Sequence, residues 1–300
     1  MFCEHTENKT ILKINNVIFL QCLICNIVYA ENNNKSFFSK NYDDYYQNTG
    51  ARFNFGVELI VKAFRFVRAL KIFLLNPNAQ SILDIGSGRG WMLYFLKKYF
   101  SFKTAIGTQI SMNAYKFSRD TLKLEIYNQD LLAIDLKKYF DTITLWHVLE
   151  HVPNPEAYLQ KIHTLLNKQG ILVIEVPNHA SWSRKLTKHH WLSWDTKHHL
   201  TFFTPATLTR LLKYYDYQII RVRTFSLEYS TFTSVQSIIN LITNTENYFF
   251  QALQNKNLNL TTCFHFFLFI LLFLPSYLVN LALYFSKSGE VINIIAKKNA

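Results

Sequence analysis

The sequence predicts an α/β protein whose mainly parallel sheet carries helices on both faces. Short apolar runs alternate with stretches of helical spacing between residues 81 and 224, which is the pattern of successive βα units. Hydrophobic residues make up 49% of the 300-residue chain and charged residues 17%, a composition that excludes a disordered protein. Four cysteines are too few for a small domain held together by disulfides.

The first strand is expected at residues 81–86, where an apolar run leads straight into Gly86, Gly88 and Gly90, and the residues that follow have helical spacing. A strand, a glycine-rich turn and a helix form a site for a nucleotide-like ligand. Glycines let the backbone come close to the ligand, and the start of the helix offers free N–H groups. The dinucleotide pattern G-x-G-x-x-G would need glycine at the position of Trp91, so a pyrophosphate loop is not favoured.

The same alternation continues along the chain. Further strands are expected at 103–107, 122–127, 141–146, 170–176, 217–224 and 291–297, and helices at 91–100, 111–119, 155–166 and 205–215. Polar or glycine-rich clusters stand at the ends of the first four strands, at 84–90, 108–109, 129–130 and 146–151. Ligands of such sheets bind at the carboxyl ends of the strands, so we expect the functional site at this edge.

Four segments carry a family resemblance. They are LDIGSGRG at 83–90, DTITLWHVLEHV at 141–152, LLNKQGILVIEVP at 165–177 and WLSWDTKHHLTFFTP at 191–205. In order and spacing they resemble the class I S-adenosylmethionine-dependent methyltransferases, most closely a branch with a small N-terminal Cys-rich ribbon. The resemblance implies a Rossmann-like, seven-stranded, mostly parallel sheet with an antiparallel last strand. It also implies S-adenosylmethionine as the cofactor.

The resemblance assigns the glycine-rich turn to the methionine part of this cofactor. By that assignment Gly86, Gly88 and Gly90 let the backbone meet the methionine moiety, and Asp84 lies near its ammonium group.

The adenosine part of the cofactor is assigned to the next strands. The resemblance implies that Asp130 accepts a hydrogen bond from the adenine amine and that Trp146 flanks the adenosine. Members of the family usually carry an acid at the end of the second strand, where it grips both ribose hydroxyls. This chain has Gln109 there, and an amide oxygen accepts more weakly than a carboxylate.

Histidines are the candidate bases for an oxygen or nitrogen acceptor, because the pKa of histidine lies near neutrality. His147 follows the fourth strand at the cofactor end, and His199 lies in the block after the fifth strand. In that block we expect Trp194, Asp195 and His198 to line or close the substrate site.

The N-terminal segment, residues 1–35, holds Cys22 and Cys25 in a C-x-x-C pair with Cys3 upstream. Two thiols at this spacing form half of a tetrahedral zinc site, and a full ribbon needs a second pair. Cys3, Cys22 and Cys25, with His5 nearby, are therefore either zinc ligands or the buried thiols of a degenerate ribbon. A signal peptide is another interpretation of the apolar run at 17–30, although the residues before it are not clearly positive.

Residues 226–287 form an insertion between two strands that the resemblance makes neighbours. Residues 262–286 are dense in Phe and Leu, and Pro275 divides them into halves too short to span a membrane. A single crossing would separate the strand at 291–297 from its sheet. We therefore expect a helical hairpin bent near Pro275, which either dips into one membrane leaflet or packs on the domain. The methyltransferase domain then comprises 40–225 and 288–300.

The expected reaction is in-line methyl transfer to a small-molecule, lipid-linked or sugar-linked acceptor. The apolar insertion favours a prenylated quinone precursor or a lipid or glycolipid, and the ribbon favours a nucleotide-linked sugar. The net charge of 32 − 20 = +12 suggests nucleic acid, but no Arg/Lys-rich stripe and no Asn-Pro-Pro-Tyr motif follows the fourth strand. A scaffold that has lost the cofactor is the non-enzymatic alternative, prompted by Gln109. Because S-adenosylmethionine is made in the cytosol, we expect a cytoplasmic protein, either free or peripheral on the cytoplasmic membrane.

Overall fold

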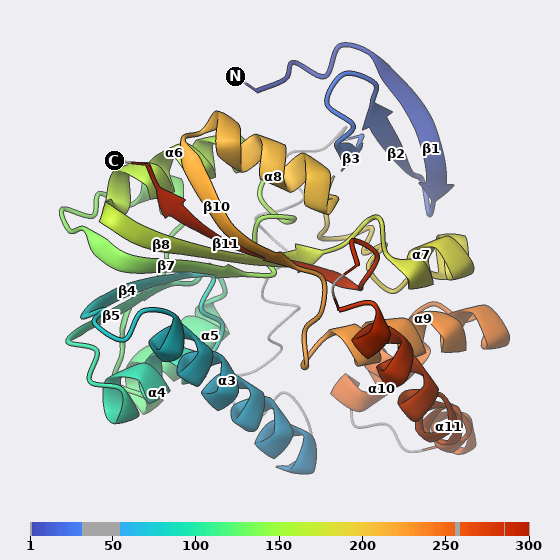
Figure 1. Cartoon of the computed structure of the whole chain (residues 1–300). Helices are drawn as coiled ribbons and strands as arrows, with labels where there is room; N and C mark the ends of the chain where they lie inside the picture. Colours follow the sequence, from blue (N-terminus) through green and yellow to red (C-terminus); the bar gives the residue numbers. More distant parts are fainter. Residues whose placement is uncertain (1, 32–54, 256–258, 285, 300) are drawn as a thin grey trace.

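A computed structural model describes residues 2–31, 55–255, 259–284 and 286–299 (Figure 1). It contains a large sheet with helices on both faces, a small antiparallel sheet near the N-terminus, and a helical insertion at one end of the large sheet. Residues 32–35 and 40–54 of the expected N-terminal segment and methyltransferase domain lie outside the described residues.

The large sheet has seven strands in the order β10-β11-β8-β7-β4-β5-β6. These are β4 (Ser81–Ile85), β5 (Thr104–Thr108), β6 (Glu125–Tyr127), β7 (Phe140–Trp146), β8 (Leu166–Pro177), β10 (Tyr217–Arg223) and β11 (Val291–Lys298). Neighbouring strands from β8 through β6 are parallel. β11 is antiparallel to both β8 and β10. The predicted fold class, including the antiparallel last strand, is confirmed.

Helices cover both faces of the sheet because its central strands are apolar on both sides. α6 (Pro155–Leu165) and α8 (Pro205–Tyr214) pack on one face, where Leu83, Ile85 and Ile174 point. α3 (Phe55–Leu75) and α4 (Trp91–Tyr99) pack on the other, where Ile82 and Val173 point. This alternation buries Ile82–Ile85 of β4 and Gly170–Pro177 of β8.

Two expected elements are shorter than the sequence pattern indicated. Helix α5 (Met112–Lys116) passes into a single π-helical turn at Phe117–Thr121 instead of continuing as an α-helix. The third strand was expected from residue 122, but only Glu125–Tyr127 pairs with β5. Leu122 and Leu124 are buried in the helix-covered core under α4, so their apolar character reflects packing and not strand pairing.

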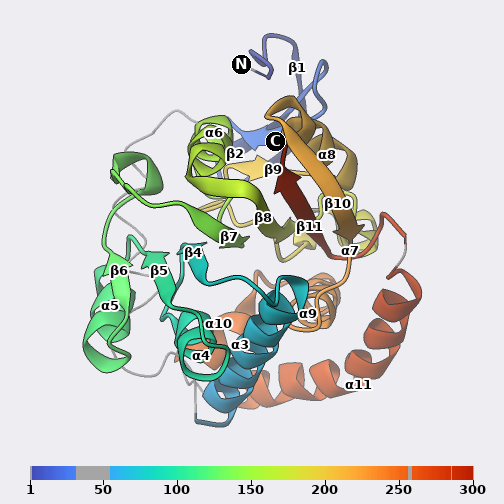
Figure 2. The ribbon, with the colours of Figure 1, turned by 60° about the vertical axis from the view of Figure 1, so that its left-hand side comes forward.

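The insertion contains α9 (Ser230–Thr243), α10 (Tyr248–Asn255) and α11 (Leu260–Ala282). The expected hairpin of two helices that meet near Pro275 is wrong, because α11 is a single helix with Pro275 inside it. This helix is not straight, and Figure 2 shows it changing direction partway along its length. Its buried face holds polar groups that bind α9: the Asn280 amide donates to the Ser234 hydroxyl over 2.9 Å. The chain thus leaves the sheet through α9 and returns to it through α11.

The small sheet consists of β1 (Asn8–Ile14), β2 (Val17–Cys22), β3 (Val28–Ala30) and β9 (Thr201–Phe202). The apolar run at 17–30 therefore forms two strands and the turn between them. β3 pairs with β9, which belongs to the chain after the fifth strand of the large sheet. This pairing attaches the N-terminal segment to the loop in which we expected the acceptor residues.

Gly289, just after the insertion, packs against Thr224, just before it. Replacing Gly289 tests this contact. A Cβ added there would lie 1.9 Å from the Thr224 carbonyl oxygen, and Asn178 also donates to the Gly289 carbonyl over 2.6 Å. We expect Gly289→Ala to lower the free energy of unfolding by at least about 2–3 kcal/mol in a urea titration.

Gly56→Ala is the matched control, because a Cβ at Gly56 meets nothing within 4 Å. It should change the free energy of unfolding by less than about 1 kcal/mol. Equal effects of the two substitutions would contradict the close packing of Gly289 against Thr224.

Candidate active site

The glycine-rich turn between β4 and α4 is braced by the end of β5. The backbone N–H of Ser87 donates to the Thr108 carbonyl over 2.9 Å. Gly86 and Gly90 have φ of +67° and +75°, and a Cβ would come within 2.5 Å of Val148 at Gly86 and within 2.6 Å of Leu124 at Gly90. Only glycine fits these two positions, so the turn keeps a bare backbone at the carboxyl end of β4.

Asp84 is the buried acid beneath this turn. Its Oδ1 accepts a hydrogen bond from the Thr144 hydroxyl over 2.6 Å. Burial raises the pKa of Asp84 from its ordinary value of 3.8 to about 6, although the Thr144 hydroxyl and the charges of Arg68 and Arg65 oppose the rise. A cationic group of a ligand placed against this carboxylate would stabilise its charged form.

The next two strands bring Gln109 and Asp130 to the same edge. The Gln109 side-chain oxygen accepts over 3.0 Å from the N–H of Ser111, the residue that caps the start of α5. Asn128 ties the two strand ends together by donating to the Gln109 carbonyl over 2.7 Å. The Asp130 carboxylate accepts from the Leu132 N–H over 2.8 Å and from the Tyr158 hydroxyl. Both side chains are therefore held in fixed orientations.

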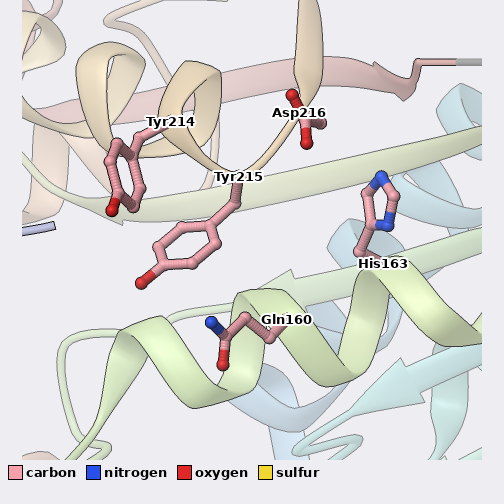
Figure 3. Close-up of a pocket in the computed structure, with 5 residues that line it drawn as sticks. All are labelled: Gln160, His163, Tyr214, Tyr215 and Asp216. Atoms are coloured by element: carbon pink, nitrogen blue, oxygen red, sulfur yellow. The ribbon is translucent and has the colours of Figure 1, made fainter. Parts of the chain in front are cut away.

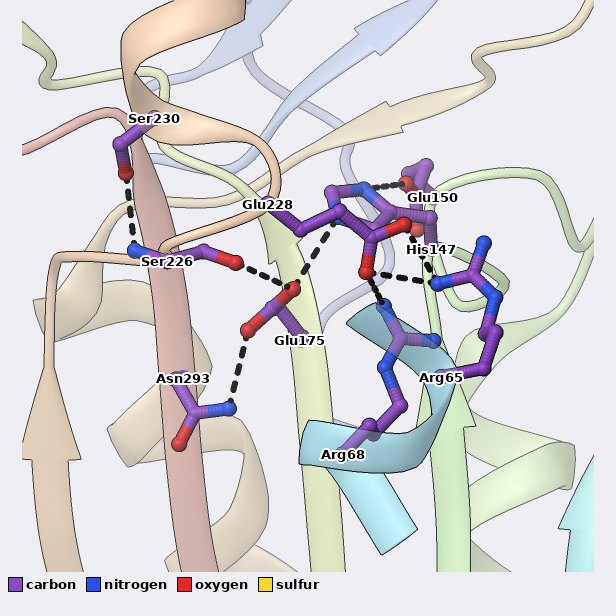
Figure 4. Close-up of polar contacts among 9 residues, drawn as sticks. All are labelled: Arg65, Arg68, His147, Glu150, Glu175, Ser226, Glu228, Ser230 and Asn293. Carbon is purple, nitrogen blue, oxygen red and sulfur yellow. Dashed lines mark hydrogen bonds and ion pairs between the residues drawn. The ribbon is translucent and has the colours of Figure 1, made fainter. Parts of the chain in front are cut away.

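Trp146 ends β7 beside a group of charged side chains that the sequence motifs did not indicate. The Arg68 guanidinium lies over its ring, 4.1 Å from the centroid, while the indole Nε1 is buried without a hydrogen-bond partner among the described residues. Arg65 and Arg68 of α3 both bind the Glu228 carboxylate, at 2.5 and 2.6 Å (Figure 4). Glu228 precedes α9, so this pair joins α3 to the start of the insertion.

His147 lies between two buried carboxylates. Its Nδ1 is 3.2 Å from Glu150 and its Nε2 is 3.4 Å from Glu175, and the ring of Tyr229 lies 4.0 Å away. Burial alone would lower the pKa of His147, but the two carboxylates raise it to about 9. The raised pKa favours the imidazolium form of His147 at neutral pH, a form that cannot accept a proton. The role of catalytic base expected from the sequence stays a prediction.

His199, the second histidine that we expected to be catalytic, lies beside Glu150 and His151. One ligand atom each of Glu150, His151 and His199 lies within 4.8 Å of the others. His151 donates from Nδ1 to the His198 carbonyl over 3.0 Å, and His199 to the Ser193 carbonyl over 2.8 Å. Burial and the neighbouring His199 lower the pKa of His151 to about 4. Two imidazoles and a carboxylate at these separations can hold a proton or a divalent cation.

The residues expected to line the substrate site have different environments. Trp194 is buried in the apolar cluster of the small sheet, with its ring centroid 4.7 Å from that of Phe19. Asp195 accepts from the His198 imidazole over 2.8 Å and from its backbone N–H over 3.2 Å. These bonds hold the pKa of Asp195 well below its ordinary value despite its burial, so Asp195 orients His198 as part of the loop.

A hollow of about 350 Å³ lies elsewhere, between α6 and the start of β10 (Figure 3). Its lining residues are Gln160, His163, Tyr214, Tyr215 and Asp216. β10 begins at Tyr217 and runs parallel to β8, so this hollow is at the amino edge of the sheet. The glycine turn and the charged cluster are at the opposite edge, and we assign no part of the reaction to the hollow.

A family model described as a methyltransferase domain matches residues 60–222. The chain belongs to this methyltransferase family. The family predicted from the sequence motifs is confirmed, and with it the enzyme class and S-adenosylmethionine as the family's cofactor.

Curated relatives of the methyltransferase differ in the atom that they methylate. The (S)-tetrahydroprotoberberine N-methyltransferase of Eschscholzia californica is 26% identical over 125 residues, which are 39% of this chain and 36% of that protein. A ubiquinone biosynthesis O-methyltransferase of Glaesserella parasuis is 32% identical over 138 residues, which are 40% of this chain and 57% of that protein. The match thus spans only about a third to about half of these relatives.

Solved structures agree on the fold. A S-adenosylmethionine-dependent methyltransferase from Archaeoglobus fulgidus has a TM-score of 0.50 at 21% identity, with 86% of this chain and 98% of that chain covered.

The residues of this methyltransferase fit the methionine end of the cofactor. The bare turn gives room for the ligand backbone, the raised pKa of Asp84 marks a carboxylate whose burial outweighs its neighbouring charges, and the Trp146 N–H has no hydrogen-bond partner among the described residues. The ribose end fits less fully, because Gln109 supplies an amide whose oxygen already accepts from the Ser111 N–H. Sequence reasoning missed Arg65, Arg68 and Glu228, which belong to no motif. Glu175 had a signal, since it is a charged residue inside an apolar strand run.

Asp84→Asn tests the energetic state of the buried acid. A rise of about two pKa units makes the charged Asp84 unfavourable for the free protein by about 3 kcal/mol at pH 7. Because the folded-state pKa is raised, this cost is full above about pH 6 and disappears below about pH 4. We expect Asp84→Asn to raise the free energy of unfolding at pH 7.5, with the gain fading toward pH 4 in urea titrations. A gain that does not depend on pH would contradict the raised pKa.

Proposed function

We propose that this methyltransferase moves a methyl group from S-adenosylmethionine to an oxygen or nitrogen atom of a small apolar acceptor held at a membrane surface. One observation carries the proposal. The insertion that exposes the apolar helix α11 also brings Glu228 and Tyr229 against the charged cluster at the carboxyl edge. An apolar surface and the reaction site thus belong to one unit of the chain.

The cofactor supplies an activated methyl group on a positively charged sulfur. The chain's own residues position the donor, shield it from water and handle the acceptor's proton. The bare turn after β4 receives the methionine part, and the Asp84 carboxylate faces its ammonium group. Arg68 covers the face of Trp146, so that this side of the site is closed by α3.

The charged His147 has an electrostatic role in this proposal. An imidazolium next to an acceptor hydroxyl stabilises the oxyanion and makes the hydroxyl easier to deprotonate. His151 is neutral at pH 7 because its pKa is lowered to about 4, and it lies with His199 beside Glu150. In this proposal the proton of the acceptor passes to the group of Glu150, His151 and His199 while His147 keeps its own, and within this group the lowered pKa makes His151 a weaker base than an ordinary histidine.

The uncovered face of α11 supports a lipid surface as the place where the acceptor is met. The helix has a mean hydropathy of 2.0 and contains no Asp, Glu, Lys or Arg. The exposed apolar side chains of α11 are spread over a face wider than a single row along the helix. They are Phe264, Phe266, Phe267, Ile270, Leu271, Phe273, Leu274 and Leu278. Such a face is wider than the seam that one partner helix would cover. We propose that α11 lies along the cytoplasmic membrane with this face in the lipid.

A labelled-methyl experiment tests the reaction. The full chain is incubated with methyl-labelled cofactor and a cell extract, and the organic and aqueous phases are counted. We expect label in the organic phase for the unchanged protein and none for Asp84→Asn, which should fold but lack the acid that faces the donor. Label in the water-soluble fraction alone would contradict an apolar acceptor and would indicate a polar small molecule or a sugar-linked acceptor instead. Label in nucleic acid would contradict the proposal.

Vesicle flotation tests the membrane surface. Replacing the exposed Phe267, Leu271 and Leu274 of α11 by serine should weaken binding to anionic lipid vesicles by on the order of a hundredfold, because each side chain contributes about 1 kcal/mol or more when buried in lipid. The matched control replaces Leu59, Ile60 and Leu74, which are equally exposed on α3. Equal loss in both triple variants, or no binding by the unchanged protein, would contradict a role of α11.

Calorimetric titration with S-adenosylhomocysteine tests the ribose end. We expect measurable binding heat for the unchanged protein and about five- to tenfold tighter binding for Gln109→Glu, because a carboxylate accepts hydroxyl protons more strongly than an amide. Gln218→Glu adds the same charge on an exposed position of β10 and should leave the affinity unchanged. The absence of binding heat would favour a scaffold that has lost its cofactor.

A further inference from the structure

Four potential metal ligands meet where the N-terminal sheet joins the catalytic domain. Cys3 and His5 precede β1, Cys22 ends β2, and Cys25 lies in the turn to β3. One ligand atom from each of the four lies within 4.8 Å of all the others. The Cys3 and Cys22 sulfurs are 3.6 Å apart, and the Cys25 sulfur is 3.4 Å from Nδ1 of His5. His5 therefore supplies the fourth position that the C-x-x-C pair and Cys3 lacked.

The separations of Cys3 from Cys22 and of Cys25 from His5 match those of a tetrahedral zinc centre. With Zn–S bonds of about 2.3 Å, tetrahedral geometry sets two sulfur ligands about 3.8 Å apart. With a Zn–N bond of about 2.0–2.1 Å, it sets a sulfur and a nitrogen ligand about 3.6 Å apart. The distances between Cys3 and Cys22 and between Cys25 and His5 both agree to within about 0.2 Å, the tolerance for a metal site. A disulfide between Cys3 and Cys22 would require a much shorter distance of about 2.05 Å.

The backbone around the sulfurs is arranged as it is around metal-bound thiolates. The Cys25 N–H points to the Cys22 sulfur at 3.4 Å, and the His5 N–H to the Cys3 sulfur at 3.5 Å. Asn26 has a φ of +60°, which turns the chain back after the C-x-x-C pair.

The four ligands also lie where three separate parts of the chain are joined. Cys22 and Cys25 are almost fully buried and belong to the main core together with α8. Arg210 of α8 donates to the Cys25 carbonyl, and the Ala30 N–H donates to the Leu200 carbonyl over 2.8 Å. Directly before Leu200 stand His198 and His199, so the turn that carries Cys25 leads through β3 to the loop of the reaction site.

We propose that Cys3, His5, Cys22 and Cys25 bind one zinc ion, and that this ion fastens β3 to β9 and so fixes the loop that carries His198 and His199. The role is structural. All four coordination positions are filled by side chains, so no position is left for a substrate or a water molecule. The inference does not depend on the proposed acceptor or on the membrane surface.

Metal analysis of the full chain tests the site. The protein is purified without chelators, and zinc is measured by elemental mass spectrometry. We expect one zinc ion per chain in the unchanged protein and in Cys263→Ser, which removes the exposed cysteine of α11. We expect loss of zinc in Cys22→Ser, and also in Cys3→Ser and His5→Ala, whose side chains are only half-buried and whose loss disturbs the core less.

Cobalt exchange and hydrogen exchange distinguish the possible outcomes. Cobalt(II) bound by this set should show the strong visible absorption of tetrahedral thiolate coordination, which the His5→Ala protein should lose or shift. Chelation of the unchanged protein should speed amide exchange in residues 28–30 and 200–203 but not in β4. Overturning results would be unchanged protein that neither contains nor takes up zinc, zinc content equal in Cys3→Ser and unchanged protein, or a mass that shows a Cys3–Cys22 disulfide.

Discussion

The antiparallel pairing of β11 between β8 and β10 is the constraint on which the rest of the molecule depends. Residues from Val291 to Lys297 pair with β8 on one side, and the same strand pairs with β10 on the other. Because β10 and β11 are neighbours, the insertion between them must leave the sheet and return at one edge. That edge is the carboxyl edge of the parallel strands, which also carries the candidate active site. The topology therefore places the apolar helices of the insertion next to the candidate active site.

Burial of charge at this edge is possible because the charges are balanced. Arg65 and Arg68 face Glu228, and the imidazolium of His147 faces Glu150 and Glu175. Glu175 is further held by the Ser226 hydroxyl at 3.2 Å and by Asn293 at 3.1 Å. Removing one partner of such a group leaves an uncompensated buried charge, which is far more costly than the net gain of the intact pair. The cluster thus fixes α3, β7, β8, β11 and the start of α9 in one arrangement.

The place of the predicted donor half could be read from the sequence because that half is local. Asp84 and the three glycines lie within one turn of chain, and the alternation of strands and helices sets their place at the sheet edge. Their contact with the donor stays a prediction. Pro275 was misleading, since proline usually breaks a helix, yet the packing of Asn280 and neighbouring residues on α9 accompanies a single helix α11. The aromatic side chain of Trp194 packs against the small sheet, which the sequence did not indicate. Arg65 and Glu228 could not be paired from sequence, because they are separated by 163 residues and belong to no motif.

The acceptor half of the candidate site could not be predicted from the sequence, because its residues come from distant segments of the chain that meet only in the folded protein. Glu150 shows how closely they are joined. Its backbone carbonyl accepts from the N–H groups of Leu200 and Thr201, at 2.8 and 3.1 Å, while its carboxylate faces His147. The strand end after β7, the loop before β9 and the N-terminal sheet are thereby coupled at one residue. Acceptor choice can then change through the insertion and this loop while the donor turn stays the same, which is consistent with one fold serving both N- and O-methyltransferases among the relatives.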